Sequence, residues 1–103
     1  MDNTMIEKIT RAVDEKRLLD TAVSLIELPS PTLSAGAVAD RLAEILVAEG
    51  FAVERPEADW PEAPAVVARL ESGEPGRVLQ FDGHLDTVHL PFVAPRIEYG
   101  ILY

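Results

Sequence analysis

The apolar residues of this chain change their spacing at Gly50, and this change limits the folds that the chain can form. Before Gly50 they recur every three or four positions, the period of an amphipathic helix. After it they alternate or form short runs, as in strands. Helices followed by strands predict a layered α/β fold, and glycine at the step suits a left-handed helix C-terminus.

Three helices are expected before this step. The first covers residues 4–13, and Asp14 offers a side-chain cap for the second. Residues 28–32, Leu-Pro-Ser-Pro-Thr, end the second helix, because a residue that precedes proline is disfavoured in the helical region. The third helix should cover residues 35–49, with Ser34 as its cap.

The strands are expected at residues 51–54, 65–70 and 77–81, and a hairpin at residues 96–103. The apolar run in 77–81 is typical of a strand buried inside a sheet. We expect the helices to pack on a mixed sheet of at least three strands. No domain boundary is visible, so residues 1–103 are treated as one unit.

The composition excludes several classes of partner. The net charge of −9 would repel phosphate backbones and anionic lipids, so we expect neither nucleic acid nor membrane as a partner. The chain has no cysteine, so any metal site must use histidine and carboxylates. No signal-peptide core is visible at the N-terminus, and no apolar run approaches the roughly 20 residues of a membrane span. A cytoplasmic protein is the expectation.

One segment contains residues that could bind a metal ion or take part in catalysis. It is Gly-His-Leu-Asp-Thr-Val, residues 83–88, directly after the third expected strand. In extended chain, residues two apart point to the same side, so His84 and Asp86 should project together. A histidine can bind zinc, and a nearby carboxylate can orient its ring, while Gly83 would permit close backbone approach. Taken alone, this two-residue pattern is a weak signal and is better explained by a partly buried histidine that pairs with an acid in a turn.

The longer string Phe81–Val88 resembles the first metal-site motif of a zinc metallohydrolase family. That family includes acetylornithine deacetylase, succinyl-diaminopimelate desuccinylase, aminoacylase and carboxypeptidase G. Three further segments resemble the same family in the same order, namely 25–32, 48–51 and 99–103. The resemblance implies that the chain is an incomplete, N-terminal part of a two-zinc, aminopeptidase-like catalytic domain.

The resemblance also implies roles for two residues. His84 matches a zinc ligand, and Asp86 matches the catalytic-site acid that supports this histidine. The implied activity is hydrolysis of an N-acyl amino acid or small peptide, by a water that zinc activates. Cobalt or manganese would also suit such ligands. A homodimer is the expectation for the parent protein.

The other ligands and the general base of this family match no position here, so the chain alone is expected to be inactive. The favoured interpretation is a fragment of a longer hydrolase. The alternatives are a catalytically dead interaction module that pairs with a full-length relative, and a coincidental motif. Nearby His89 is interpreted as a loop histidine, and Ser30 and Thr32 as turn or capping residues.

Overall fold

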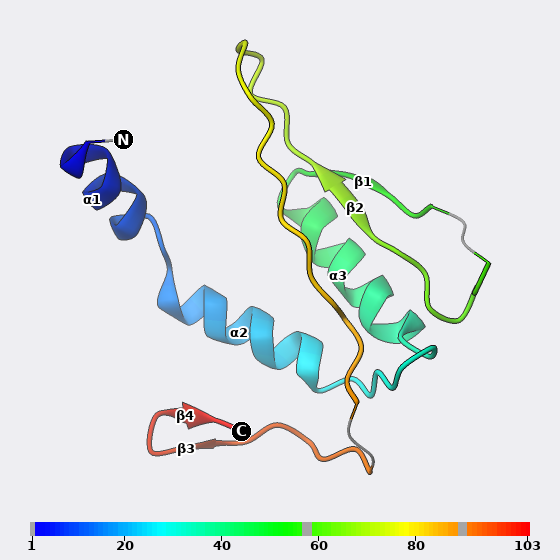
Figure 1. The fold of residues 1–103 in the computed structure, drawn as a ribbon. Coiled ribbons are helices and arrows are strands. Elements are labelled where there is room, and N and C mark those ends of the chain that lie inside the picture. The colour runs from blue at the N-terminus through cyan, green and yellow to red at the C-terminus, as the bar shows by residue number, and fades with distance from the viewer. Residues whose placement is uncertain (1, 57–58, 89–90) are drawn as a thin grey trace.

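A computed structural model describes residues 2–56, 59–88 and 91–103 and has an α/β architecture (Figure 1). No helix among these residues is long and apolar enough to cross a membrane. The helix-to-strand change at Gly50 is confirmed. The elements are the helices α1 (Asn3–Arg11), α2 (Glu15–Ile26) and α3 (Gly36–Ala48), and the strands β1 (Ala52–Glu54), β2 (Val67–Arg69), β3 (Ile97–Glu98) and β4 (Ile101–Leu102).

The start of α2 is capped as predicted, but the start of α3 is not. The Asp14 carboxylate accepts a hydrogen bond of 3.0 Å from the backbone N–H of Arg17. The cap position of α3 is Ala35, which makes no side-chain cap bond, so the predicted Ser34 cap is wrong. The reason is a turn in which the Ser34 N–H donates to the Pro31 carbonyl at 2.8 Å and displaces the helix start by one residue.

The end of α3 forms the left-handed cap that the sequence predicts. Gly50 has a φ of 91°, and its N–H donates to the Val47 carbonyl at 3.0 Å. The next N–H, of Phe51, reaches back to the Leu46 carbonyl at 3.1 Å. These two bonds form a Schellman motif, which satisfies carbonyls at the helix end and reverses the chain. As a result β1 returns along α3 and packs against it.

The packed part of the chain is small and is centred on α3. Among the described residues, only Ser30, Ala35, Val38 and Ala39 are buried. Helix α1 buries none of its residues and is set apart from the α2–α3 pair in Figure 1. The radius of gyration is 16.3 Å, against about 13 Å for a compact domain of this length. The described residues therefore form an open arrangement with little core.

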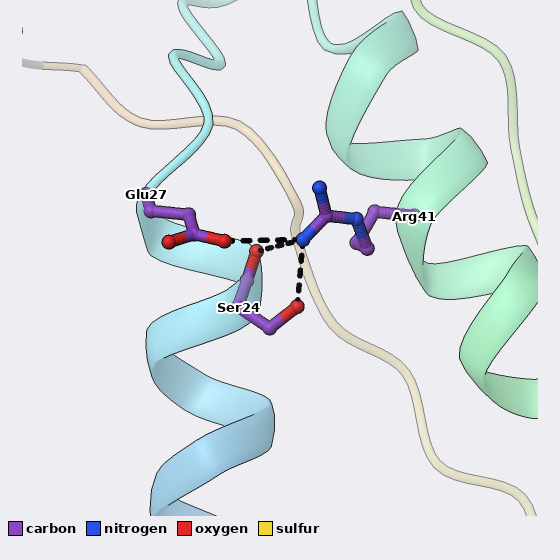
Figure 2. Close-up of polar contacts among 3 residues, drawn as sticks. All are labelled: Ser24, Glu27 and Arg41. Carbon is purple, nitrogen blue, oxygen red and sulfur yellow. Dashed lines mark hydrogen bonds and ion pairs between the residues drawn. The ribbon is translucent and has the colours of Figure 1, made fainter.

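A polar clamp joins α2 to α3 (Figure 2). The Arg41 guanidinium, on α3, donates from one nitrogen to the Ser24 hydroxyl at 2.8 Å and to the Ser24 carbonyl at 3.2 Å. The same nitrogen lies 3.1 Å from the Glu27 carboxylate. Because Ser24 and Glu27 lie in the last turn of α2 and at its C-terminal cap, the positive charge also complements the helix dipole there.

The sheets differ from the prediction. Strands β1 and β2 pair antiparallel, with Val53 opposite Ala68, and β3 pairs only with β4. Residues 77–81 form no strand, and Val78 and Phe81 are 92% and 87% exposed. The predicted buried strand and the mixed sheet of at least three strands are therefore wrong for the described residues. The backbone of residues 77–81 has no strand partner among the described residues, so the apolar side chains of this segment have no sheet to pack in.

The predicted C-terminal hairpin is confirmed. Ile97 pairs with Leu102 and Glu98 with Ile101, across a two-residue turn. Both turn residues, Tyr99 and Gly100, have positive φ values of 51° and 74°, as in the type I′ turns that suit hairpins.

Replacing Arg41 with methionine should lower the free energy of unfolding by about 1–2 kcal/mol, because the clamp loses its charged donor while helix propensity is kept. Urea denaturation followed by circular dichroism measures this change. The control is Arg11→Met. Arg11 lies 3.9 Å from Glu7 on exposed α1, so its change should stay within about 0.5 kcal/mol. Equal losses in the two variants would show that the clamp does not stabilise the helix pair.

Replacing Gly50 with alanine should cost about 1 kcal/mol of stability, because alanine is strained at a φ of 91°. A Cβ atom at Gly50 would meet nothing within 4 Å, so the cost would come from the backbone alone. Gly76→Ala is the matched control, since Gly76 is equally open and has no positive φ. Denaturant midpoints of both variants measure the difference, and no difference would contradict the strain.

Candidate functional site

The candidate site lies on an irregular, extended segment rather than at the end of a sheet strand. Residues 82–86 have no regular secondary structure, and Thr87 forms an isolated bridge. Asp82 accepts hydrogen bonds from the amide of Gln80 at 3.1 and 3.3 Å. A Cβ atom at Gly83 would meet nothing within 4 Å, so the described residues make no close backbone approach there.

His84 and Asp86 project together, as their spacing predicts. The His84 Nδ1 atom lies 3.5 Å from the Asp86 Oδ1 atom. This distance is within the range of an ion pair but longer than a good hydrogen bond. The imidazole is 95% exposed and the carboxylate 32% exposed. The carboxylate therefore lies on the Nδ1 side of an exposed ring.

A third residue of the site, Thr32, comes from a segment far away in the sequence. Its hydroxyl donates a hydrogen bond of 2.9 Å to the Asp86 Oδ2 atom. The two carboxylate oxygens of Asp86 thus have separate neighbours, one in Thr32 and the other in His84. Sequence reasoning assigned Thr32 to a turn and missed this contact, because no local pattern links positions 54 apart.

Backbone contacts bring the two segments together beside this hydrogen bond. The Thr87 N–H donates to the Ser30 carbonyl at 2.7 Å, and Pro31 and Thr87 form an isolated parallel bridge. Ser30 is 3% exposed, so this junction is among the few buried points of the described chain. The Leu-Pro-Ser-Pro-Thr segment and the His-x-Asp segment, both parts of the family resemblance, therefore meet in space.

The turn that carries Thr32 has an unusual backbone. Leu33 has a φ of 67°, a left-handed conformation that non-glycine residues rarely adopt. Its carbonyl accepts a 2.9 Å hydrogen bond from the indole N–H of Trp60. Trp60 therefore fastens its loop to this turn. This contact also holds the turn next to Thr32.

The site residues fit one corner of a metal site and do not complete one. No group of three or more histidine, cysteine, aspartate or glutamate side chains that could hold a metal ion occurs in the described ranges. His89 lies outside the described residues. A catalytic zinc ion takes about three protein ligands, and His84 with Asp86 supplies at most two donors. Among the described residues, His84 is the one histidine, and its ring is exposed.

Comparison with known proteins identifies relatives along most of this chain. A succinyl-diaminopimelate desuccinylase of Methylorubrum populi is 40% identical over 97 residues, which cover 82% of this chain. Proteins of the same name from Methylobacterium radiotolerans and Methylorubrum extorquens are 38% and 37% identical over the same share of the chain. No family model matches the chain. No solved structure matches it either.

These relatives are much longer than the present chain, which spans 24% of the length of each. The family resemblance seen in Phe81–Val88 and three further segments is thus confirmed. The identity of 37–40% to these relatives extends over 82% of the chain and not only over short motifs. The chain belongs to the sequence family that includes the succinyl-diaminopimelate desuccinylases, of whose length it spans about a quarter.

Proposed function

We propose that this chain is part of the catalytic domain of a metal-dependent hydrolase that removes an acyl group from an N-acylated amino acid. The observation that carries the proposal is the 37–40% identity to three desuccinylases over 82% of the chain. Their name describes the removal of a succinyl group from diaminopimelate. The chemical class proposed for the present protein is the broader one, an acyl amino acid or a small peptide with a hydrolysable amide bond.

His84 is the proposed metal ligand, and Asp86 is the acid that supports it. The exposure of the imidazole leaves Nε2 open, while Asp86 faces Nδ1 and orients the ring. The proposed metal is zinc, two ions in the complete site, which would polarise the amide carbonyl and lower the pKa of a bound water. Histidine and carboxylate ligands would also accept cobalt or manganese.

The remaining ligands and the general base are proposed to lie outside these 103 residues. The described residues offer the His84–Asp86 pair and no group of three or more side chains that could hold a metal ion. The relatives are about four times as long, which leaves ample chain for the missing ligands. By this proposal the 103 residues alone bind metal weakly and do not hydrolyse the amide.

Sequencing the source gene past codon 103 decides whether a longer protein exists to be tested. An open frame that continues with acidic and histidine residues in the family's order would support the hydrolase. A stop codon directly after Tyr103 would contradict the proposal that this protein completes the site by itself.

In the protein as the gene encodes it, His84→Ala should remove at least one metal ion per chain and lower kcat/KM by about 100-fold or more, since a ligand is lost. Metal content is measured by mass spectrometry after dialysis, and activity on N-succinyl and N-acetyl amino acids. His89→Ala is the matched control and should retain metal and activity. Full metal content and activity in His84→Ala would show that the assignment is wrong.

One feature of the structure favours a second function, a module that pairs with a full-length relative. Residues 77–81 form no strand and pair with no strand of the described ranges, and Val78, Leu79 and Phe81 are between 78% and 92% exposed. Such a segment can add to the edge of another sheet. Sedimentation of the 103-residue chain mixed with a full-length desuccinylase tests this. A stable complex without metal in the short chain would support the module.

A further inference from the structure

We propose that Thr32 is a positioning residue for the metal site, acting through Asp86 on His84. The inference rests on the proposed function, because it assigns Thr32 a task only if His84 binds metal. The observation behind it is a chain of two contacts: Thr32 Oγ1 to Asp86 Oδ2 at 2.9 Å, and Asp86 Oδ1 to His84 Nδ1 at 3.5 Å.

The carboxylate of Asp86 needs such a partner in order to orient a histidine. A carboxylate rotates easily about its last side-chain torsion, so one oxygen faces a chosen direction only if the other is held. Among the described residues, Thr32 is the one side chain that donates a hydrogen bond to Asp86. A hydrogen bond to an ionised group is also among the stronger kinds, so this contact can fix the carboxylate plane.

Thr32 is itself held on both sides. The preceding residue, Pro31, forms the bridge to Thr87, immediately after Asp86. The following residue, Leu33, has the left-handed φ of 67° and is fastened by Trp60. Strained backbone persists where surrounding contacts over-determine it, and such positions gather at functional sites. The left-handed residue therefore sits where it fixes the direction of the Thr32 side chain.

Two tasks can be separated at this junction, docking of the segments and orientation of the carboxylate. Docking is carried by the bond of 2.7 Å from the Thr87 N–H to the Ser30 carbonyl, a backbone contact that does not involve the Thr32 side chain. Orientation depends on the Thr32 hydroxyl alone. Valine has the shape of threonine without its hydroxyl, so Thr32→Val removes the second task and leaves the first.

The test compares Thr32→Val, Thr32→Ser and Thr10→Val in the protein as the gene encodes it. Thr10 is the matched control, because its hydroxyl donates to the Ile6 carbonyl within exposed α1. Zinc affinity is measured by competition with a chromophoric chelator, and kcat and KM with an N-succinyl amino acid. Hydrogen exchange of the Thr87 amide reports on docking.

The expected result for Thr32→Val is a loss of about 10-fold in zinc affinity, the low end for a residue that supports a metal ligand. We expect kcat to fall while KM is kept, because Thr32 is not proposed to contact substrate. Thr32→Ser should restore both values, and Thr10→Val should match the wild type. The Thr87 amide should remain protected in every variant.

Three results would overturn the inference. Unchanged zinc affinity and kcat in Thr32→Val, alongside their loss in His84→Ala, would overturn it and leave the proposed function standing. Loss of Thr87 protection in Thr32→Val would show that the residue holds the fold rather than the carboxylate. Full metal binding and activity in His84→Ala would overturn the proposed function, and the inference with it.

Discussion

The hydrogen bond from the Thr87 amide to the Ser30 carbonyl is the contact on which the geometry of the candidate site depends. It joins segments that are 57 positions apart and is one of few long-range ties between the helical part of the chain and residues 77–88. Closing a loop of this length costs conformational entropy, which the local contacts must offset. Ser30, whose carbonyl accepts the bond, is buried, and the bond places Asp86 within reach of Thr32.

Polar contacts hold much of the remaining arrangement, because little apolar surface is buried. Arg41 joins α2 to α3, Arg17 at the start of α2 pairs with Glu49 at the end of α3, and Arg55 pairs with Asp40. Exposed ion pairs of this kind contribute little individually, since water and salt screen them. Only the Arg41 clamp also uses hydrogen bonds to a partly buried hydroxyl and carbonyl. The Arg41 clamp is therefore the most extensive of these three polar contacts, whereas α1 buries none of its residues.

Features set by neighbouring residues could be predicted from the sequence. The Asp14 cap, the Gly50 turn and the C-terminal hairpin each depend on chemistry within about four positions, so their residue types were sufficient. The proximity of His84 to Asp86 is of the same local kind. The prediction of Ser34 as a cap was wrong, because a turn that begins at Pro31 displaces the start of α3 by one residue. Residue propensities alone do not decide whether Ser34 joins the turn or caps the helix.

Features set by distant partners could not be predicted in this way. Residues 77–81 have the composition of a buried strand, but a strand exists only with a partner, and the described residues provide none. The Thr32–Asp86 contact was not predicted either. A threonine after proline has an adequate local explanation as a turn residue, so nothing in the sequence indicated a distant partner. Contacts between residues that are far apart in the sequence could thus not be predicted from the pattern of residue types.

The two unpredicted features have a common consequence for the site. Asp86 is held from the helical side by Thr32, whereas His84 follows the unpaired segment 77–81 and is 95% exposed. The carboxylate is therefore fixed better than the imidazole that it faces. Their separation of 3.5 Å is longer than a good hydrogen bond. Catalytic hydrogen bonds are often long before a site is complete, and a metal ion on Nε2 would restrain the ring from its other side. In the proposed site, the described residues therefore fix the supporting Thr32–Asp86 pair more firmly than the proposed ligand His84, whose side chain is 95% exposed.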